Sequence, residues 1–131
     1  MLGIGTMVYQ LSGGSPKDPK DYYGKKIETA EFNGDAITLV FTDGIKIKIT
    51  DEGQTCCENR YMTCDDEPKD LEGGSLVSIR INKIEEKGNE YGDPHEIAFL
   101  VIETEKTAIT FCTHNEHNGY YGGFALSINE E

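Results

Sequence analysis

The sequence has no apolar run that approaches the ~20 residues needed to cross a bilayer. The longest candidate, 97–102, has only the length of a strand, and Met1–Gln10 lacks the basic and apolar regions of a secretory signal peptide. Basic residues are also scarce: 12 lysines and arginines stand against 24 acidic residues, a net charge of −12, and the only arginines are Arg60 and Arg80. A surface for nucleic-acid backbone needs clustered basic residues, so the composition argues against that class of partner.

The four cysteines, Cys56, Cys57, Cys64 and Cys112, contain no C-x-x-C pair. Cys56 and Cys57 are adjacent, and adjacent cysteines rarely bridge because the resulting ring is strained. A chain of 131 residues can bury a core without disulfide staples. We therefore expect a reduced, cytoplasmic protein.

From Lys25 onward apolar and polar residues alternate with the period of strands. Asn33-Gly34 and Asp43-Gly44 are hairpin turn dipeptides, because their residues tolerate positive φ. The pattern predicts strands over 27–32, 37–42, 45–50, 75–84, 97–102, 107–113 and 124–128. We expect a mainly β protein, an antiparallel β-sandwich or small barrel of about seven strands with one short helix.

The remaining segments set the expected domain limits. Residues 1–21 contain prolines, glycines and charges and are expected to form a flexible arm or extension, which leaves 22–131 as a single β domain. Asp65–Leu71 is expected to form one helical turn, and Glu85–Pro94 a polar loop. The run 97–102 is apolar on both faces, which predicts a central strand buried on both sides.

Two polar segments are too particular to be ordinary turns: DEGQTCCENRYM over 51–62 and HNEHNGYYGGF over 114–124. A smaller third is His95-Glu96. Together with HEIAFLVIET over 95–104, these strings resemble a family of small uncharacterised proteins of bacteriophages and prophages, over about 22–128. The resemblance implies a phage accessory protein acting in the host cytoplasm, and nothing about reaction type. The positions it singles out are Cys57, Glu58, Arg60, Tyr61, His114, Asn115, His117, Asn118, Tyr120 and Tyr121.

The residue types of these segments favour a small anionic or nucleotide-like ligand, and no enzymatic activity is needed to hold one. Tyrosines can stack on a base, Asn and His can read its edges, Arg60 can hold a phosphate, and glycines allow close approach. The expected ligand-binding residues are Glu58, Arg60, Tyr61, His114, Asn115, His117, Asn118, Tyr120 and Tyr121. Such sites often lie between subunits, so we expect a homodimer or higher oligomer. The function predicted is sequestration of such a molecule, for which a host immune signal is a candidate.

Four other interpretations stay open. His114 and His117 have H-x-x-H spacing and could bind zinc if the backbone turns between them, with Cys57, or alternatively Cys64 or His95, as a further ligand. Cys57 near Arg60 could also serve as a nucleophile of a cysteine-dependent enzyme. Alternatively, the protein is an acidic inhibitor of a host protein, or the two segments are structural turns with aromatic packing.

Overall fold

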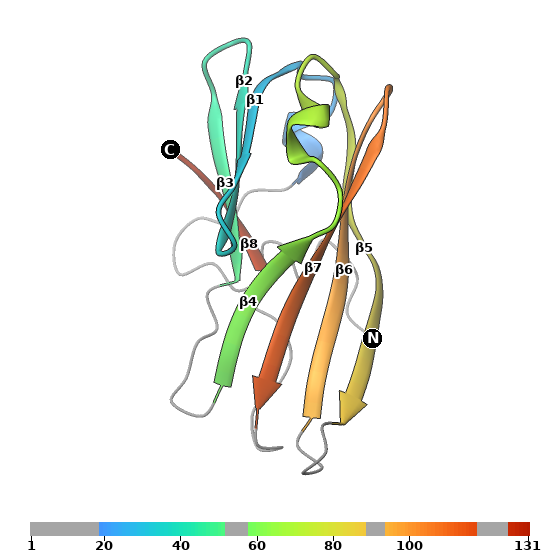
Figure 1. Ribbon diagram of the computed structural model, residues 1–131. Helices are drawn as coiled ribbons and strands as arrows, with labels where there is room; N and C mark the ends of the chain where they lie inside the picture. Colours follow the sequence, from blue (N-terminus) through green and yellow to red (C-terminus); the bar gives the residue numbers. More distant parts are fainter. Residues whose placement is uncertain (1–18, 52–57, 89–93, 118–125) are drawn as a thin grey trace.

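The computed structural model describes residues 19–51, 58–88, 94–117 and 126–131 (Figure 1). These residues form eight strands in two antiparallel four-stranded sheets that face each other (Figure 1). The expected β-sandwich is therefore confirmed. No helix in this part of the chain is long and apolar enough to cross a membrane.

The first sheet has the strand order β1-β2-β3-β8 and the second the order β4-β7-β6-β5. The strands of the first sheet are β1 (Ile27–Phe32), β2 (Ala36–Phe41), β3 (Lys46–Asp51) and β8 (Leu126–Glu130). Those of the second are β4 (Glu58–Cys64), β5 (Leu76–Gly88), β6 (Pro94–Thr104) and β7 (Ala108–His117). Two 3-10 turns, η1 (Pro19–Tyr22) and η2 (Pro68–Leu71), complete the described elements.

The two predicted hairpin turns connect β1 to β2 and β2 to β3. Gly34 and Gly44 have φ of 93° and 89°, which only a residue without a Cβ adopts at little cost. In the first turn the side chain of Asn33 accepts hydrogen bonds from the backbone N–H groups of Asp35 and Ala36, at 2.9 and 2.8 Å. The turn dipeptides thus fix the register of the first sheet.

The core lies between the sheets and follows the predicted alternation. Ile47 and Ile49 of β3 are fully buried, whereas Lys46 on the same strand is exposed. The two sheets meet where Phe32 of β1 contacts Phe111 of β7 edge to face, with ring centroids 5.3 Å apart. Such edge-to-face contact is the preferred arrangement of aromatic pairs.

Strand β6 is buried on both faces, as its apolar run predicted. It pairs with β7 on one side and β5 on the other. Ala98, Leu100 and Ile102 face the core with no exposed surface, and Ile97 and Val101 on the opposite face are only 7% and 6% exposed. Phe99, between these two residues on the outer face, is half-buried.

Two expectations are wrong in detail. The predicted polar loop 85–94 is the end of a long hairpin, because β5 continues to Gly88 and β6 begins at Pro94. Strand β4 lies in a segment for which no strand was expected. Of the arm expected over 1–21, residues 1–18 lie outside the described residues, and the rest belongs to η1, whose Pro19 and Tyr22 are buried; the Tyr22 ring stacks on Phe41 at 5.8 Å. The helical turn near Asp65–Leu71 is confirmed as η2.

Replacing Gly74 by alanine is expected to destabilise the fold by about 1–3 kcal/mol, the usual cost of overpacking. Gly74 is buried, and a Cβ there would lie 2.7 Å from both Cβ and Oγ1 of Thr104. Its backbone is also held, because its carbonyl accepts a hydrogen bond from Ile27. Urea unfolding measures the loss. Ser75→Ala at the next position is the control, and an equal effect of both substitutions would contradict the steric explanation.

Candidate functional site

Residues 58–62 and 114–117, the parts of the two motif segments that the structure describes in β4 and β7, lie side by side because these strands are neighbours. β4 and β7 pair antiparallel, with Glu58 opposite His117, Arg60 opposite Asn115 and Tyr61 opposite His114. β6 pairs with the other side of β7 and places His95 opposite Glu116. All three polar segments of the sequence therefore meet on β4, β7 and β6, at the end of the sheet where β4 and β6 begin and β7 ends (Figure 1).

Alternate residues of β7 face opposite sides of the second sheet. Phe111, Thr113 and Asn115 are buried on the side of the core, and Asn115 has no exposed surface. His114 and Glu116 are half-buried on the outer face. Of the predicted ligand residues, Tyr61 and His114 thus share one face, while Asn115 lies on the other.

Three aromatic rings stand in a row across β6, β7 and β4 on this outer face. The row consists of His95, His114 and Tyr61 and is called the aromatic row below. The rings of Tyr61 and His114 are stacked, with centroids 4.5 Å apart and planes within 9°. The centroids of His95 and His114 are 5.2 Å apart, with the planes tilted by 37°.

Hydrogen bonds fix the orientation of every ring in the aromatic row. His114 Nδ1 lies 3.0 Å from His95 Nε2, and His114 Nε2 lies 2.9 Å from the hydroxyl of Thr63. A neutral imidazole donates through one nitrogen and accepts through the other. In that form His114 either accepts from Thr63 and donates to His95, or accepts from His95 and donates to Thr63. The Tyr61 hydroxyl donates to Glu116 Oε2 at 2.7 Å. The row is therefore a preorganised surface of flat faces with polar edges.

Burial raises the pKa of the Tyr61 phenol to about 12, and the hydrogen bond to Glu116 and the charge of that carboxylate add to the effect. The phenol ordinarily titrates near 10. Above that pH the unfolded chain loses this proton while the folded protein keeps it. The contribution of the raised Tyr61 pKa to the free energy of unfolding is thus fully present below about pH 10, and it is lost as the pH rises toward 12.

This pKa shift can be tested with Tyr61→Phe. The substitution removes the phenol of Tyr61 and leaves the other buried tyrosine, Tyr22, unchanged in both proteins. The stability of the wild-type protein relative to Tyr61→Phe is expected to fall between about pH 10 and pH 12. Urea unfolding midpoints of both proteins across that range provide the measurement. A difference that stays constant with pH would show that the phenol of Tyr61 has an ordinary pKa.

The thiol of Cys64 is not activated. Burial raises its pKa, and its Sγ lies 3.4 Å from the carbonyl oxygen of Thr110. The nucleophile considered from the sequence, Cys57, lies outside the described residues. So do Asn118, Tyr120 and Tyr121, and for Glu58, Arg60 and His117 only the backbone is described.

The expected zinc site shared by His114 and His117 depends on a bend between them. β7 continues as a strand through both residues, so that bend is absent. Within the described ranges no group of three or more His, Cys, Asp or Glu side chains is placed to hold a metal ion. His114 instead contacts His95 directly, and a zinc role for Cys57 remains a prediction outside the described part of the chain.

Sequence reasoning did not place three residues of the site in the ligand set: His95, Thr63 and Glu116. His95 stood out as a polar residue before an apolar strand, but nothing in the sequence showed that β6 lies beside β7. Thr63 follows Tyr61 by two residues, and that spacing on a strand puts both on one face. Recognition of β4 as a strand would therefore have been enough to identify Thr63.

Comparison with known proteins gives one match. A family model described as a domain of unknown function (DUF7448) matches residues 20–126. This range contains the whole aromatic row and both motif segments. No curated protein and no solved structure matches the chain.

Proposed function

The chain belongs to the family of the DUF7448 domain of unknown function, and from the geometry of its site we propose that it sequesters a small nucleotide-like molecule. The observation that carries the proposal is the aromatic row. The rings of Tyr61 and His114 already lie at stacking distance without a ligand. Hydrogen bonds of His114 to His95 and Thr63 fix its orientation. A preorganised site binds more tightly because less side-chain freedom is lost on binding.

A base can extend the row at Tyr61. β4 is the edge strand of the second sheet, and His114 covers the face of the Tyr61 ring that is directed toward β7. The next stacking position therefore lies at the edge of this sheet. Stacking of one base on an aromatic side chain contributes about 1–3 kcal/mol.

Polar groups around the row suit the edges of such a base. The hydroxyl of Thr63 and the carboxylate of Glu116 lie at either end of the Tyr61–His114 stack and can exchange hydrogen bonds with ring nitrogens and amino groups. Arg60, the phosphate contact predicted from the sequence, stands opposite Asn115 on the other face of β4 from Tyr61, so a phosphate of the stacked ligand would have to reach it around the edge of β4. One arginine with backbone N–H groups can hold a phosphate, so a net charge of −12 is compatible with an anionic ligand.

The resemblance of the two motif segments to small phage proteins supports a biological setting for the proposal. A phage gains from removing a signal of host immunity, and stoichiometric capture needs a tight site without catalytic machinery. We therefore place host immune nucleotides first among the candidate ligands.

The test is capture from a panel of cyclic and ADP-ribose-derived nucleotides. Purified protein is incubated with the panel, small molecules are removed, and heat then releases what was bound for mass spectrometry. The proposal predicts depletion of one member from solution and its intact recovery after heating. Failure to deplete any member, or recovery of a hydrolysed product only, would contradict sequestration.

A further inference from the structure

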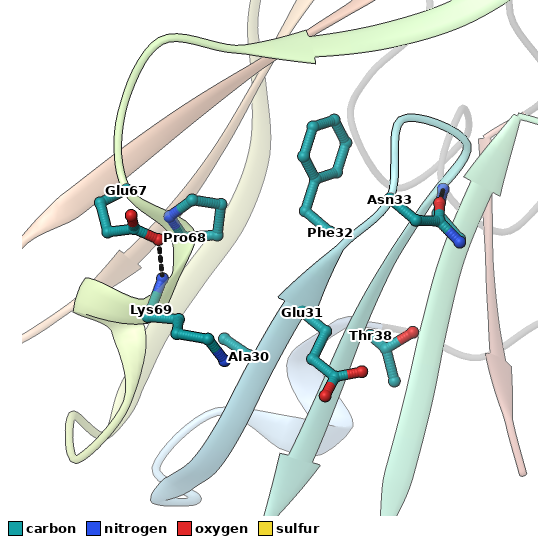
Figure 2. Close-up of a pocket in the computed structure, with 9 residues that line it drawn as sticks. Ala30, Glu31, Phe32, Asn33, Thr38, Glu67, Pro68 and Lys69 are labelled. Atoms are coloured by element: carbon teal, nitrogen blue, oxygen red, sulfur yellow. Dashed lines mark hydrogen bonds between the residues drawn. The ribbon is translucent and has the colours of Figure 1, made fainter.

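A groove of about 420 Å³ lies between the β1–β2 hairpin and η2, and no residue of the aromatic row lines it. Figure 2 shows its two sides: Glu31, Phe32 and Asn33 extend from the hairpin, and Pro68 and Lys69 face them from η2. Its apolar lining is supplied by Ala30, Phe32, Ala36 and Pro68. Its volume is in the range of ligand sites.

Along this groove the edge of the first sheet is open at Phe32, and in the turn beyond it the carbonyl of Gly34 accepts a hydrogen bond from the N–H of Met62 on β4 at 2.8 Å. The beginning of β1 is covered, because Ile27 exchanges backbone hydrogen bonds with Gly73 and Gly74, and the N–H of Ala30 donates to Glu72 Oε2 at 3.0 Å. Residues two apart on a strand direct their backbone groups to the same edge. The N–H and C=O of Phe32 therefore point away from β2 toward the groove, and the described residues supply no partner for them there.

The elements around the groove are strongly acidic. Strand β1, its turn and the segment 65–72 carry eight acidic residues and one lysine, whereas the whole chain has a net charge of −12. The eight are Glu28, Glu31, Asp35, Asp65, Asp66, Glu67, Asp70 and Glu72. The lysine, Lys69, lies 3.6 Å from Glu72, so its charge is already matched. Among the residues that line the groove, Glu31 and Glu67 are acidic and Lys69 is basic, so most of this negative charge lies on the flanking residues of the same elements.

We propose that the groove docks an extended, basic segment of a partner protein, which adds a strand to the open part of the β1 edge. The backbone of the segment bonds to Phe32, as in other cases of strand addition to a sheet edge. Its basic side chains face Glu31 and the neighbouring carboxylates, and its apolar side chains contact Phe32, Ala36 and Pro68. The apolar lining and the open backbone groups favour a peptide over a small cation, which would use the carboxylates alone.

The test measures fluorescence anisotropy of a labelled hexapeptide that alternates lysine and valine, at about 0.1 M salt, where long-range attraction is screened. Glu31→Lys is compared with Glu131→Lys. Both substitutions change the net charge equally, but Glu131 is an exposed residue beyond β8, on the opposite edge of the first sheet. A second peptide has the same sequence, but its backbone nitrogens are methylated along the edge that would pair with β1. Its binding to the wild-type protein is measured in the same way. Spermidine serves as a competitor.

The proposal predicts that Glu31→Lys weakens peptide binding by about three- to tenfold, the range for losing one exposed ion pair and adding a repulsion. Glu131→Lys is expected to change it less than about twofold. Methylation is expected to weaken binding by at least about fivefold, because the peptide N–H that would donate to the Phe32 carbonyl is replaced by a methyl group that also prevents close strand pairing. Equal effects of the two substitutions, unchanged binding of the methylated peptide, or full displacement by equimolar spermidine would each overturn the proposal. The methylated peptide keeps the test decisive even if Glu31→Lys does not fold.

Discussion

Substitution of Phe111 by alanine is expected to lower the free energy of unfolding by about 3–5 kcal/mol, the usual cost of removing a buried aromatic side chain. Phe111 has no exposed surface, and its edge-to-face contact with Phe32 joins the two sheets. Its loss leaves a cavity between β7 and β1 that close-packed neighbours fill only in part.

Urea denaturation followed by circular dichroism measures this change as a lower midpoint. The control is Val77→Ala on β5 of the same sheet, because Val77 is 45% exposed. That variant is expected to stay within about 0.5 kcal/mol of the wild-type protein. A loss below about 1 kcal/mol for Phe111→Ala would show that the sheets do not pack through this residue.

The second large effect is expected for Tyr61→Ala, measured with the nucleotide that the capture experiment identifies. Loss of the stacking surface is expected to weaken binding by roughly 10- to 100-fold, since one stacked base contributes about 1–3 kcal/mol. Tyr61→Phe keeps the ring and loses only the hydrogen bond to Glu116. It is expected to bind within about fivefold of the wild-type protein, because one such bond contributes about 1 kcal/mol.

Isothermal titration calorimetry on variants with a confirmed fold gives these affinities. Tyr23→Ala is the matched control, because Tyr23 is an exposed tyrosine just after η1 and its hydroxyl bonds to the backbone of Ile79 on β5, at the opposite edge of the second sheet from β4. Wild-type affinity in Tyr61→Ala, or an equal loss in Tyr23→Ala, would contradict a stacking role for the aromatic row.

Much of the fold could be predicted because most strands bury one face. The alternation of Ile47 and Ile49 with Lys46 and Lys48 reports directly on which side is in the core. β4 was missed because it is an edge strand with polar residues on its outer face, and Met62 is its one buried apolar side chain among those described. A single apolar residue produces no visible period.

The candidate site was predicted as two segments, but their contact depends on strand order. Only the pairing of β4 with β7 brings Tyr61 to His114, and only the pairing of β6 with β7 adds His95. Strand order is set by long-range packing, which local sequence patterns do not encode. Residues that are adjacent in the sequence can also lie apart in the structure. Asn115 follows His114 directly, yet alternation along the strand buries it on the other face of the sheet.

The most direct test of the account is the nuclear magnetic resonance spectrum of the imidazole rings during titration with the captured nucleotide. The chain has three histidines, so each ring can be assigned by substitution. We predict that the ring signals of His95 and His114 shift in proportion to the bound fraction, because a base that extends the stack on Tyr61 changes the ring currents and hydrogen bonds of the aromatic row. A nucleotide that binds at saturation while both signals stay unchanged would show that the ligand site lies elsewhere.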